Sequence, residues 1–312
     1  MKWKIPLYKI FTDRDDNKAV NKVLQRGMDW AIGHEIAEFE KKIANYIGTK
    51  YCVAFNSGTS AGHAALLAIN INSGEVIVPS FTFISTANWP LMVNAKPKFV
   101  DIEEENFGLS PERVKVEITK NTKAIIPIHY GGRPCKIIEI NRIARNKKIT
   151  LIEDCAESFG AKIKGVSVGT FGQMSIFSFA PNKILTTGEG GVICTDSRKI
   201  FEKLQLIRSH GRKVNENYFK TSQLPNYISI GYNWRMSSMT AALGLSQFDK
   251  LDRIIQLRRR HARFYVLKLK KINEIKLPDE PKDHLHVYQL FTIQLKNNLI
   301  RNELQKFLAS RG

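Results

Sequence analysis

Short apolar runs alternate with helical patterns between residues 50 and 240, and this alternation limits the possible folds more than any other feature. Each run has the length of a strand and is bounded by glycine, proline or polar residues. Strands joined by helices form a mainly parallel sheet with both faces covered. We therefore expect one large three-layer α/β domain. The expected strands are Tyr51 to Phe55, Val76 to Pro79, Pro97 to Ile102, Thr122 to His129, Ile149 to Glu153, Gln173 to Phe179 and Gly191 to Thr195.

Helical periodicity borders this block on both sides. Near the N-terminus, apolar side chains recur at helical spacing up to Gly27, and again from Glu35 to Ile47. Residues 197–210 predict a further helix, and residues 211–232 predict a polar loop. We assign residues 1–240 to the large domain.

The last part of the chain predicts a linking helix and a fragment of a second domain. A long helix, kinked or split, begins after Ser238 and reaches Ile272. Residues from His286 to Leu295 alternate as in a half-buried strand, and Leu299 to Ala309 predict a last helix. We expect residues 241–312 to hold the linking helix and an incomplete small α+β domain.

The charge balance suits acidic partners without indicating a nucleic-acid site. The chain has 312 residues and a formal net charge of +19, from 48 Lys and Arg against 29 Asp and Glu. The basic residues are dispersed, and the densest run, Arg258 to Arg260, lies on an amphipathic helical pattern. We interpret this as a basic surface and expect no nucleic acid as a partner.

The sequence shows no sign of export, a membrane span or a metal site. The N-terminus lacks the apolar region of a secretory signal, and no run reaches the ~18 apolar residues of a membrane span. Widely spaced cysteines in apolar runs indicate reduced core thiols rather than disulfides or a zinc site. We expect a cytoplasmic protein with no membrane partner. The cysteines are Cys52, Cys135, Cys155 and Cys194.

One lysine occupies an unusual place, on a tight loop between two apolar strands. Ser175 to Phe179 lead into a proline-containing turn with Lys183, and Gly188 to Gly191 return the chain to the next strand. Lysine is rarely buried unless it is paired or reacting, and a desolvated amine can form a Schiff base. For such a lysine alone, a side chain that extends to water is the commoner explanation.

A glycine-containing turn, Ser57-Gly58-Thr59-Ser60, joins the first strand of the block to an apolar helix. Free N–H groups at a helix N-terminus suit a phosphate. Ordinary helix capping by serine or threonine explains the same residues. The patterns G-x-x-x-x-G-K-[ST] and G-x-G-x-x-G are absent, which argues against a nucleotide triphosphatase or a dehydrogenase.

A carboxylate, Asp154, follows the strand at Ile149 to Glu153, where α/β sheets bind ligands. It suits a pyridinium N–H, because a charge-assisted hydrogen bond of about 1.5–3 kcal/mol keeps such a ring protonated. Capping of the next segment is an equally good explanation. With the lysine and the phosphate turn, Asp154 predicts pyridoxal phosphate. One of Phe81, Phe83 and Trp89 is expected to stack on the flat ring of the cofactor, although aromatic residues in such positions more often pack in the core.

Seven motifs in order resemble the DegT/StrS family of fold-type-I, pyridoxal-phosphate-dependent aminotransferases, and the resemblance runs from Ile5 to Gly312. Each motif alone is weak, but their order and spacing are specific. They are Ser57-Gly-Thr, Pro79-Ser-Phe-Thr-Phe83, His129-Tyr-Gly-Gly, Glu153-Asp-Cys-Ala-Glu157, Phe177-Ser-Phe with Lys183, Thr187-Gly-Glu-Gly-Gly191 and Gly231-Tyr-Asn-Trp-Arg-Met236.

The resemblance assigns roles to the candidate site residues. It implies that Lys183 is the Schiff-base lysine and proton shuttle, and that Asp154 pairs with the pyridine nitrogen. It places Glu157 near the ring hydroxyl, where relatives often have glutamine or histidine. The remaining cofactor contacts that it implies are stacking by Phe83, phosphate binding by Gly58, Thr59 and Ser178, and a phosphate contact by Asn233 from the partner subunit of a homodimer.

The implied activity is transfer of an amino group, with glutamate as the expected donor, to a nucleotide-linked keto-sugar in surface polysaccharide or amino-sugar biosynthesis. Alternatives are a dehydratase or cyclitol aminotransferase of the same family, and a cofactor-binding protein without catalysis. Some relatives have histidine instead of the lysine and catalyse dehydration, so Lys183 favours amino transfer. Family members usually continue beyond the match to Gly312, and we expect a truncated or shortened relative with impaired activity.

Two pairs of polar residues each have two interpretations. His129 and Tyr130 follow a strand, where substrate contact and a satisfied core pair are both reasonable. His284 and His286 lie two apart on one strand face. We expect a surface histidine pair there instead of a metal site, because no third ligand is evident.

Overall fold

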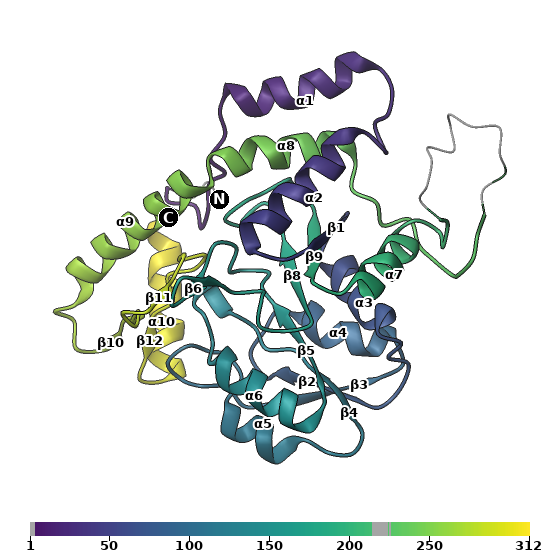
Figure 1. Cartoon of the computed structure of the whole chain (residues 1–312). Coiled ribbons are helices and arrows are strands. Elements are labelled where there is room, and N and C mark those ends of the chain that lie inside the picture. Colours follow the sequence, from purple (N-terminus) through teal and green to yellow (C-terminus); the bar gives the residue numbers. More distant parts are fainter. Residues whose placement is uncertain (1–3, 214–223, 225) are drawn as a thin grey trace.

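A computed structural model describes residues 4–213, 224 and 226–312, and their centre is a seven-stranded sheet (Figure 1). The strand order is β1-β9-β8-β5-β4-β2-β3. Every strand coincides with a predicted apolar run, although the run at 122–129 forms a shorter strand than expected. The polar loop predicted at 211–232 lies partly outside the described residues. The strands are β1 Tyr51–Phe55, β2 Glu75–Pro79, β3 Lys96–Val100, β4 Thr122–Ile125, β5 Thr150–Asp154, β8 Met174–Ser178 and β9 Gly191–Thr195.

The sheet is mainly parallel, as predicted. From β3 through β2, β4 and β5 to β8, every neighbouring pair is parallel. Strand β9 runs antiparallel to both of its neighbours, β8 and β1. The chain therefore reverses direction between β8 and β9, and Lys183 lies on that connection.

Helices cover both faces of the sheet, which confirms the three-layer α/β architecture. Alternate strand residues supply the two faces: Val53 packs towards α3, α4 and α7, whereas Cys52 packs towards α2. Helices α4 and α5 were not predicted; each contains a proline, inside α4 and at the first turn of α5. The helices are α2 His34–Ile47, α3 Gly58–Ala68, α4 Ile84–Met92, α5 Pro111–Glu117, α6 Ile137–Lys147 and α7 Arg198–Arg208.

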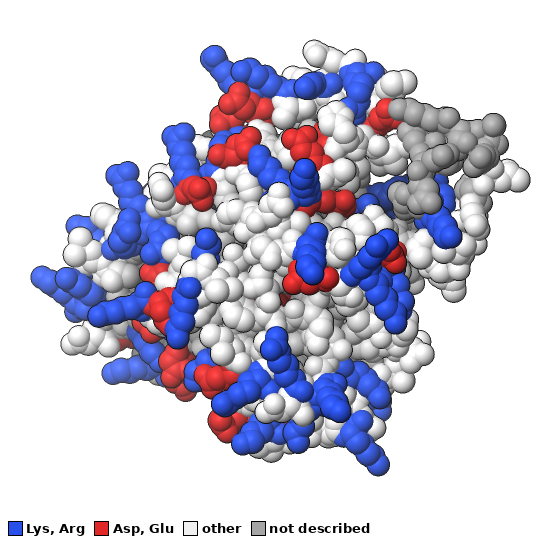
Figure 2. Space-filling model, in the orientation of Figure 1, with Lys and Arg blue, Asp and Glu red and all other residues white. Residues whose placement is uncertain are grey.

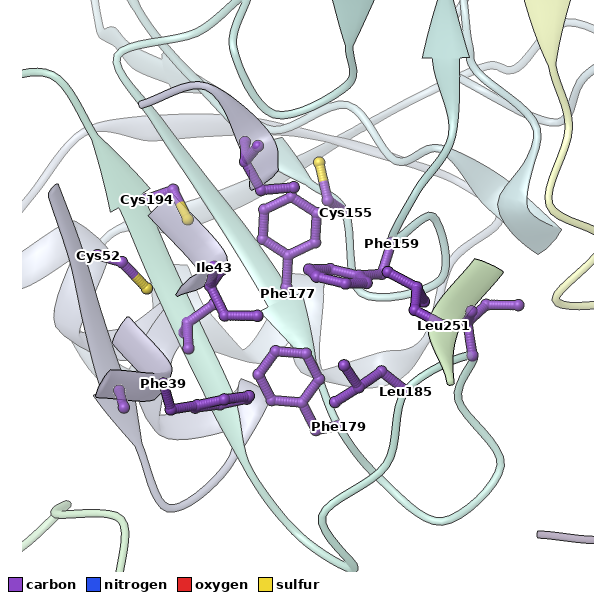
Figure 3. Close-up of a cluster of buried hydrophobic side chains, with 14 of the residues drawn as sticks. Phe39, Ile43, Cys52, Cys155, Phe159, Phe177, Phe179, Leu185, Cys194 and Leu251 are labelled. Atoms are coloured by element: carbon purple, nitrogen blue, oxygen red, sulfur yellow. The ribbon is translucent and has the colours of Figure 1, made fainter. Parts of the chain in front are cut away.

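Aromatic rings fill the core between α2 and the sheet (Figure 3). Phe39 of α2 meets Phe179 edge to face, with ring centroids 5.4 Å apart. Phe159 contacts both Phe177 and Phe179 in the same manner. Cys52 and Cys194 lie opposite each other on β1 and β9 and are free thiols, as predicted. Because Phe179 directly precedes the Lys183 loop, this core fixes the point where that loop begins.

The N-terminal helix α1 (Arg14–Arg26) packs on α8 (Ser238–Asp249) through a buried carboxylate. Asp16 is 4 % exposed and accepts hydrogen bonds from Ser246 Oγ at 2.7 Å and Gln247 Nε2 at 3.0 Å. Lys250 Nζ lies 2.6 Å from the same carboxylate. Three donors from one helix and its end thus hold α1 in place.

The predicted long helix is split at Lys250, where α8 ends and α9 (Leu251–Leu269) begins. Small strands and a last helix, α10 (Asn298–Arg311), follow it. Of the strand predicted from His286 to Leu295, only Gln294–Leu295 forms one; the rest is wrong, because Tyr288 takes a left-handed conformation (φ 50°), which ends strand geometry there. The short strands are β6 Lys162–Ile163, β7 Val166–Ser167, β10 Ile275–Lys276, β11 His284–Leu285 and β12 Gln294–Leu295.

Basic and acidic side chains are intermixed on the surface. In Figure 2 lysines and arginines spread over the whole visible face, with acidic residues between them. This agrees with the dispersed charge that the sequence indicates. None of the helices in the described part of the chain is long and apolar enough to cross a membrane.

Candidate active site

The carboxyl ends of the parallel strands bring the candidate residues to one edge of the sheet. Gly191, at the start of β9, lies opposite both Phe55 at the end of β1 and Ser178 at the end of β8. Asp154 ends β5 and lies opposite Ile176 on β8. Since ligands of α/β sheets bind at this edge, its polar side chains form the candidate active site.

The turn at the start of α3 approaches β8 and β9 closely. Ser57 caps α3 by accepting a hydrogen bond from the Ser60 amide at 3.0 Å, so the predicted capping role is correct. A Cβ added to Gly58 would lie 3.0 Å from Ser178 Cβ, and one added to Gly191 would lie 2.6 Å from Gly58 N. This close backbone approach places the free N–H groups of the first helical turn beside the Ser178 hydroxyl, an arrangement that suits a phosphate.

Asp154 is a buried carboxylate with few partners. It is 2 % exposed, accepts a 2.7 Å hydrogen bond from Thr86 Oγ1 and a 3.1 Å bond from the Ala156 amide. Burial raises the pKa of Asp154 above 3.8, partly opposed by the Thr86 hydrogen bond and by the charge of Lys183. The alternative of capping the next segment is also correct, because Asp154 accepts from the Ala156 amide at the start of the turn that follows, although no helix begins there.

Lys183 lies in the same place and faces a carboxylate. Its Nζ is 3.5 Å from Glu157 Oε1, and both side chains are about one-seventh exposed, at 14% and 15%. The other oxygen of Glu157 accepts a 2.8 Å hydrogen bond from the Gly131 amide. Lys183 is therefore a partly buried, paired lysine, and the interpretation of a side chain extended to water is wrong.

Aromatic residues border this region on the side of α4. Phe83 is the N-cap of α4 and is 69 % exposed, so one face of its ring is free to stack on a ligand. Phe81 packs on Tyr130, with ring centroids 4.8 Å apart. Thr59 contacts α4 through a 3.0 Å hydrogen bond between its hydroxyl and that of Ser85.

Asn233 differs from the other candidates because its side chain has no bond to them. It is exposed, and its backbone pairs with Ser209. The rings on either side, Tyr232 and Trp234, stack with centroids 3.9 Å apart, so Asn233 projects the opposite way. Within the described residues, no hydrogen bond joins Asn233 to Lys183.

His129 belongs to a buried polar network, so the core interpretation is correct for it. Its Nε2 lies 3.1 Å from Glu153 Oε2, and its Nδ1 accepts from the Cys135 amide at 3.1 Å. Cys155 joins these two in a compact group of metal-ligand types. The Glu153 oxygens are already occupied by backbone N–H groups, which supports a structural role. Those donors are the amides of Gly169, Phe171 and Gly172.

The expectation of a surface histidine pair is correct for His284 and wrong for His286. His284 is partly exposed and lies 2.7 Å from Asp283, as a surface histidine would. His286 is 3 % exposed and stacks on Tyr288 with centroids 3.8 Å apart. His286 also accepts a 3.0 Å hydrogen bond from the Tyr288 amide at its Nδ1, so its ring belongs to the interior.

Residues 11–312 match the DegT/DnrJ/EryC1/StrS aminotransferase family. The chain belongs to this family. The GDP-perosamine synthase of Escherichia coli O157:H7 is 36% identical over 309 residues, which are 98% of this chain and 82% of that protein.

Solved structures of family members share the fold. Helicobacter pylori PseC, an aminotransferase involved in the biosynthesis of pseudoaminic acid, is 26% identical with a TM-score of 0.92, over 98% of this chain and 82% of PseC. The E. coli GDP-4-keto-6-deoxy-D-mannose-3-dehydratase with bound hydrated PLP is 30% identical with a TM-score of 0.90, over 98% of this chain and 83% of the dehydratase chain. The fold is thus that of the fold-type-I enzymes, and the cofactor is pyridoxal phosphate.

The residues present fit this cofactor. Gly58 and Gly191 let the N-terminus of α3 approach β8 and β9 closely, which leaves the first N–H groups of α3 beside the Ser178 hydroxyl, a set of donors that suits a phosphate. The buried Asp154 carboxylate suits the protonated ring nitrogen, and Lys183 offers the amine. When bound, pyridoxal phosphate supplies an aldehyde for amines and a ring that withdraws electrons.

Sequence reasoning missed the residues that support this site. Thr86 bonds Asp154 from the first turn of α4, a helix that was not predicted. Gly131 orients Glu157, and its left-handed conformation (φ 62°) was signalled only by the Gly-Gly pair after Tyr130. Arg258 and Gln289 reach the Lys183 loop from the C-terminal part. No local pattern in the sequence identifies such long-range partners.

Proposed function

We propose that this protein transfers an amino group from glutamate to the ketone of a nucleotide-linked sugar, in polysaccharide biosynthesis, with Lys183 as the residue that binds the cofactor and moves the proton. The pairing of Lys183 with Glu157 beside the buried Asp154 is the observation that carries this proposal. The names of its relatives, which include a GDP-perosamine synthase, support the sugar-nucleotide class.

Each residue has a defined task in this proposal. With the cofactor bound, Lys183 would hold it through its amine and, once the amino donor has freed that amine, would hold and move the proton at the reacting carbon. Asp154 would face the ring nitrogen with its carboxylate and favour the electron-withdrawing chemistry that the ring supplies. Glu157 and Gly131 keep the Lys183 amine at this position when it is free.

The site is proposed to be completed by a second copy of the chain. Asn233 is exposed and turned away from the rings that flank it, so it is available to a neighbour. Apolar side chains near it are also exposed, namely Tyr227 at 60% and Ile230 at 85%. In a homodimer, Asn233 would donate to the phosphate at the partner's α3 N-terminus.

Dehydration of the same class of substrate is the alternative reaction. A family neighbour at 30% identity is a sugar-nucleotide dehydratase, so the fold supports both outcomes. Lys183 favours amino transfer, because its amine can both hold the cofactor and return a proton to the product carbon.

A cofactor assay with a donor half-reaction tests the proposal. The protein purified with pyridoxal phosphate should absorb visible light, and Lys183→Ala should abolish that absorbance. Glutamate alone should convert the bound cofactor to its aminated form, and a 4-keto or 3-keto sugar nucleotide should restore it. Release of unaminated, dehydrated sugar would instead support the dehydratase.

Lys203→Ala is a matched control for this assay. Lys203 is likewise a lysine whose Nζ donates a hydrogen bond, in its case to the carbonyl oxygen of Ala68, but it lies on α7 away from the site. Its replacement should leave absorbance and turnover unchanged. Visible absorbance that survives in Lys183→Ala would contradict the assignment of Lys183.

A further inference from the structure

The carbonyl oxygen of Asn182, directly before Lys183, is held by two side chains from the C-terminal part of the chain. Gln289 Nε2 donates to it at 2.5 Å and Arg258 Nη2 at 3.5 Å. At the other end of the same peptide bond, the Lys183 amide donates to Ala180 O at 3.0 Å. Because the peptide bond is planar, holding both ends sets the direction in which the Lys183 side chain leaves the backbone.

Among the described residues, the groups that accept hydrogen bonds from Arg258 are backbone carbonyl oxygens. From α9, its Nη1 donates to Tyr288 O at 3.3 Å and to Gln289 O at 3.2 Å. Among the described residues no carboxylate lies within salt-bridge distance of it, and burial lowers the pKa of its guanidinium. A partly buried arginine without an acidic partner costs stability unless its N–H groups are satisfied, and here backbone oxygens satisfy them.

The segment 287–290 also holds the opposite side of the site. The Val287 amide donates to Gly132 O at 3.1 Å, and the Leu290 amide to Gly131 O at 3.0 Å. Gly131 in turn orients Glu157, which faces the Lys183 amine. Both the backbone and the amine of Lys183 are therefore connected to this one segment.

The packing around Gly132 leaves this segment little freedom. Gly132 has a φ of +90°, and a Cβ there would lie 2.7 Å from Val287 Cγ2 and 2.9 Å from Gln289 N. Gln289 is 5 % exposed. Gly132 thus packs directly on the backbone of this segment, and the buried side chain of Gln289 bonds Asn182 from this closely packed position.

We infer that Arg258 and Gln289 are positioning residues that fix the Asn182–Lys183 peptide and so direct the Lys183 amine towards the cofactor. The inference rests on the role proposed for Lys183. Both residues act through Lys183. Their loss should slow the reaction of the amine with the cofactor aldehyde more than it changes binding of the sugar nucleotide.

Cofactor capture by the cofactor-free protein tests this. Arg258→Met and Gln289→Met keep side-chain length and remove the donors. Mixed with pyridoxal phosphate, each should develop visible absorbance about ten-fold more slowly than wild type, because small misplacements of a reacting group are costly. Turnover should show a similar fall in kcat with little change in KM for the sugar nucleotide.

Two further variants separate positioning from general damage. Arg258→Lys keeps a donor and should recover part of the capture rate. Arg260→Met removes an exposed arginine two residues along the same helix and should match wild type. If Arg258→Met does not fold, Gln289→Met carries the test, since it removes no charge. Melting temperatures report folding independently of capture.

The outcomes distinguish this inference from the proposed function. Borohydride reduction followed by mass spectrometry locates the cofactor in wild type. With the cofactor on Lys183, capture rates in both methionine variants equal to that of Arg260→Met would overturn the positioning role alone. A cofactor on another residue in wild type would overturn the proposed role of Lys183, and this inference with it.

Discussion

The side-chain carboxylate of Asp154 is buried from solvent. Its two hydrogen bonds come from a hydroxyl and a backbone amide, and the nearest opposite charge that acts on it is that of Lys183. A buried group of this kind lowers stability in order to hold charge for a bound partner. The ring nitrogen of the cofactor is the partner that this arrangement suits.

Replacing Asp154 with asparagine should separate stability from activity. Burial raises the folded pKa of Asp154 above 3.8, so the folded protein binds more protons than the unfolded chain between these two pKa values. Stability is therefore lost as pH rises through the folded pKa. The cofactor-free Asp154→Asn variant should unfold at a higher urea concentration than wild type at pH 7, with a smaller difference towards pH 4.

The same variant should lose activity. Without a fixed negative charge at the ring nitrogen, kcat should fall by about 10²–10³-fold. Asp101→Asn, at a carboxylate whose side chain is 71% exposed, is the control and should change neither property. An Asp154→Asn variant that is less stable than wild type at pH 7 would contradict the interpretation of a strained, buried charge.

His286 should make the protein sensitive to acid. Burial lowers the pKa of His286 to about 4, against the ordinary value of 6.5, with Glu280, Arg133 and Arg259 as its charged neighbours. The unfolded chain thus binds a proton before the folded one does, so stability is fully present above pH 6.5 and is lost as pH falls towards 4. At about 1.4 kcal/mol for each pH unit, the loss is roughly 3 kcal/mol.

The pH dependence of urea unfolding measures this effect. In His286→Asn, whose amide oxygen can accept the hydrogen bond from the Tyr288 amide, the slope between pH 6.5 and 4 should be smaller by about one proton. His284→Asn, two residues away and partly exposed, should keep the wild-type slope. Identical slopes in both variants would show that His286 titrates normally.

The residues proposed to touch the cofactor were predictable, whereas those that support them were not. Lys183, Asp154 and Gly58 stand next to strand ends and turns, which are local features of the sequence. Thr86 and Gln289 are ordinary in their local context. Their importance comes from partners 68 and 107 positions away, at Asp154 and Asn182. Such pairing is decided by the fold.

At the scale of elements, the same distinction separates strands from the C-terminal segment. The strands were predictable because continuous apolar runs fit a sheet buried on both faces. The alternation from His286 to Leu295 has the period of a strand, yet a left-handed Tyr288 and the bonds to Gly131 and Gly132 produce an irregular segment. Helix α4 escaped prediction because Pro90 interrupts its pattern.

Helix α1 should depend on Asp16 for its attachment. Asp16→Ala removes the acceptor of Ser246 and the buried anion beside Lys250, while Asp13 still accepts from Lys250 and Phe11 O from Gln247, and it should destabilise the protein by about 1–3 kcal/mol. Asp15→Ala removes an exposed carboxylate from the same helical turn and should cost less than about 1 kcal/mol.

Urea unfolding measures both variants, and hydrogen exchange shows whether α1 separates first. In Asp16→Ala the amides of α1 should exchange faster than those of β8. Equal stability of the two variants would mean that α1 is held by its apolar contacts alone.

At the scale of the whole molecule, a shared active site should permit complementation. Lys183→Ala and Asn233→Asp should each be inactive, the second because a carboxylate repels the cofactor phosphate. In a homodimer that exchanges subunits, a mixture of the two contains heterodimers with one intact site. Random pairing then restores about a quarter of the wild-type activity.

Mixing two variants of the same half-site provides the control. Lys183→Ala with Asp154→Asn leaves every site with one defect, so activity should stay at the level of the separate variants. Sedimentation of the mixtures confirms that dimers are present. A Lys183→Ala and Asn233→Asp mixture that stays inactive although heterodimers form would show that Asn233 serves its own subunit or none.

The reversal of β9 also has a consequence for synthesis on the ribosome. Because β8 and β9 are hydrogen-bonded neighbours that pair Ser178 with Gly191, the loop with Lys183 closes by local contacts as soon as both strands have emerged. Arg258 and Gln289 emerge later, so the nascent chain carries the reactive lysine on a loop whose peptide is not yet fixed. If these two residues position Lys183 as inferred above, its amine should reach its working orientation only after α9 and the segment 287–290 have folded onto the loop, so capture of the cofactor should follow the folding of these segments.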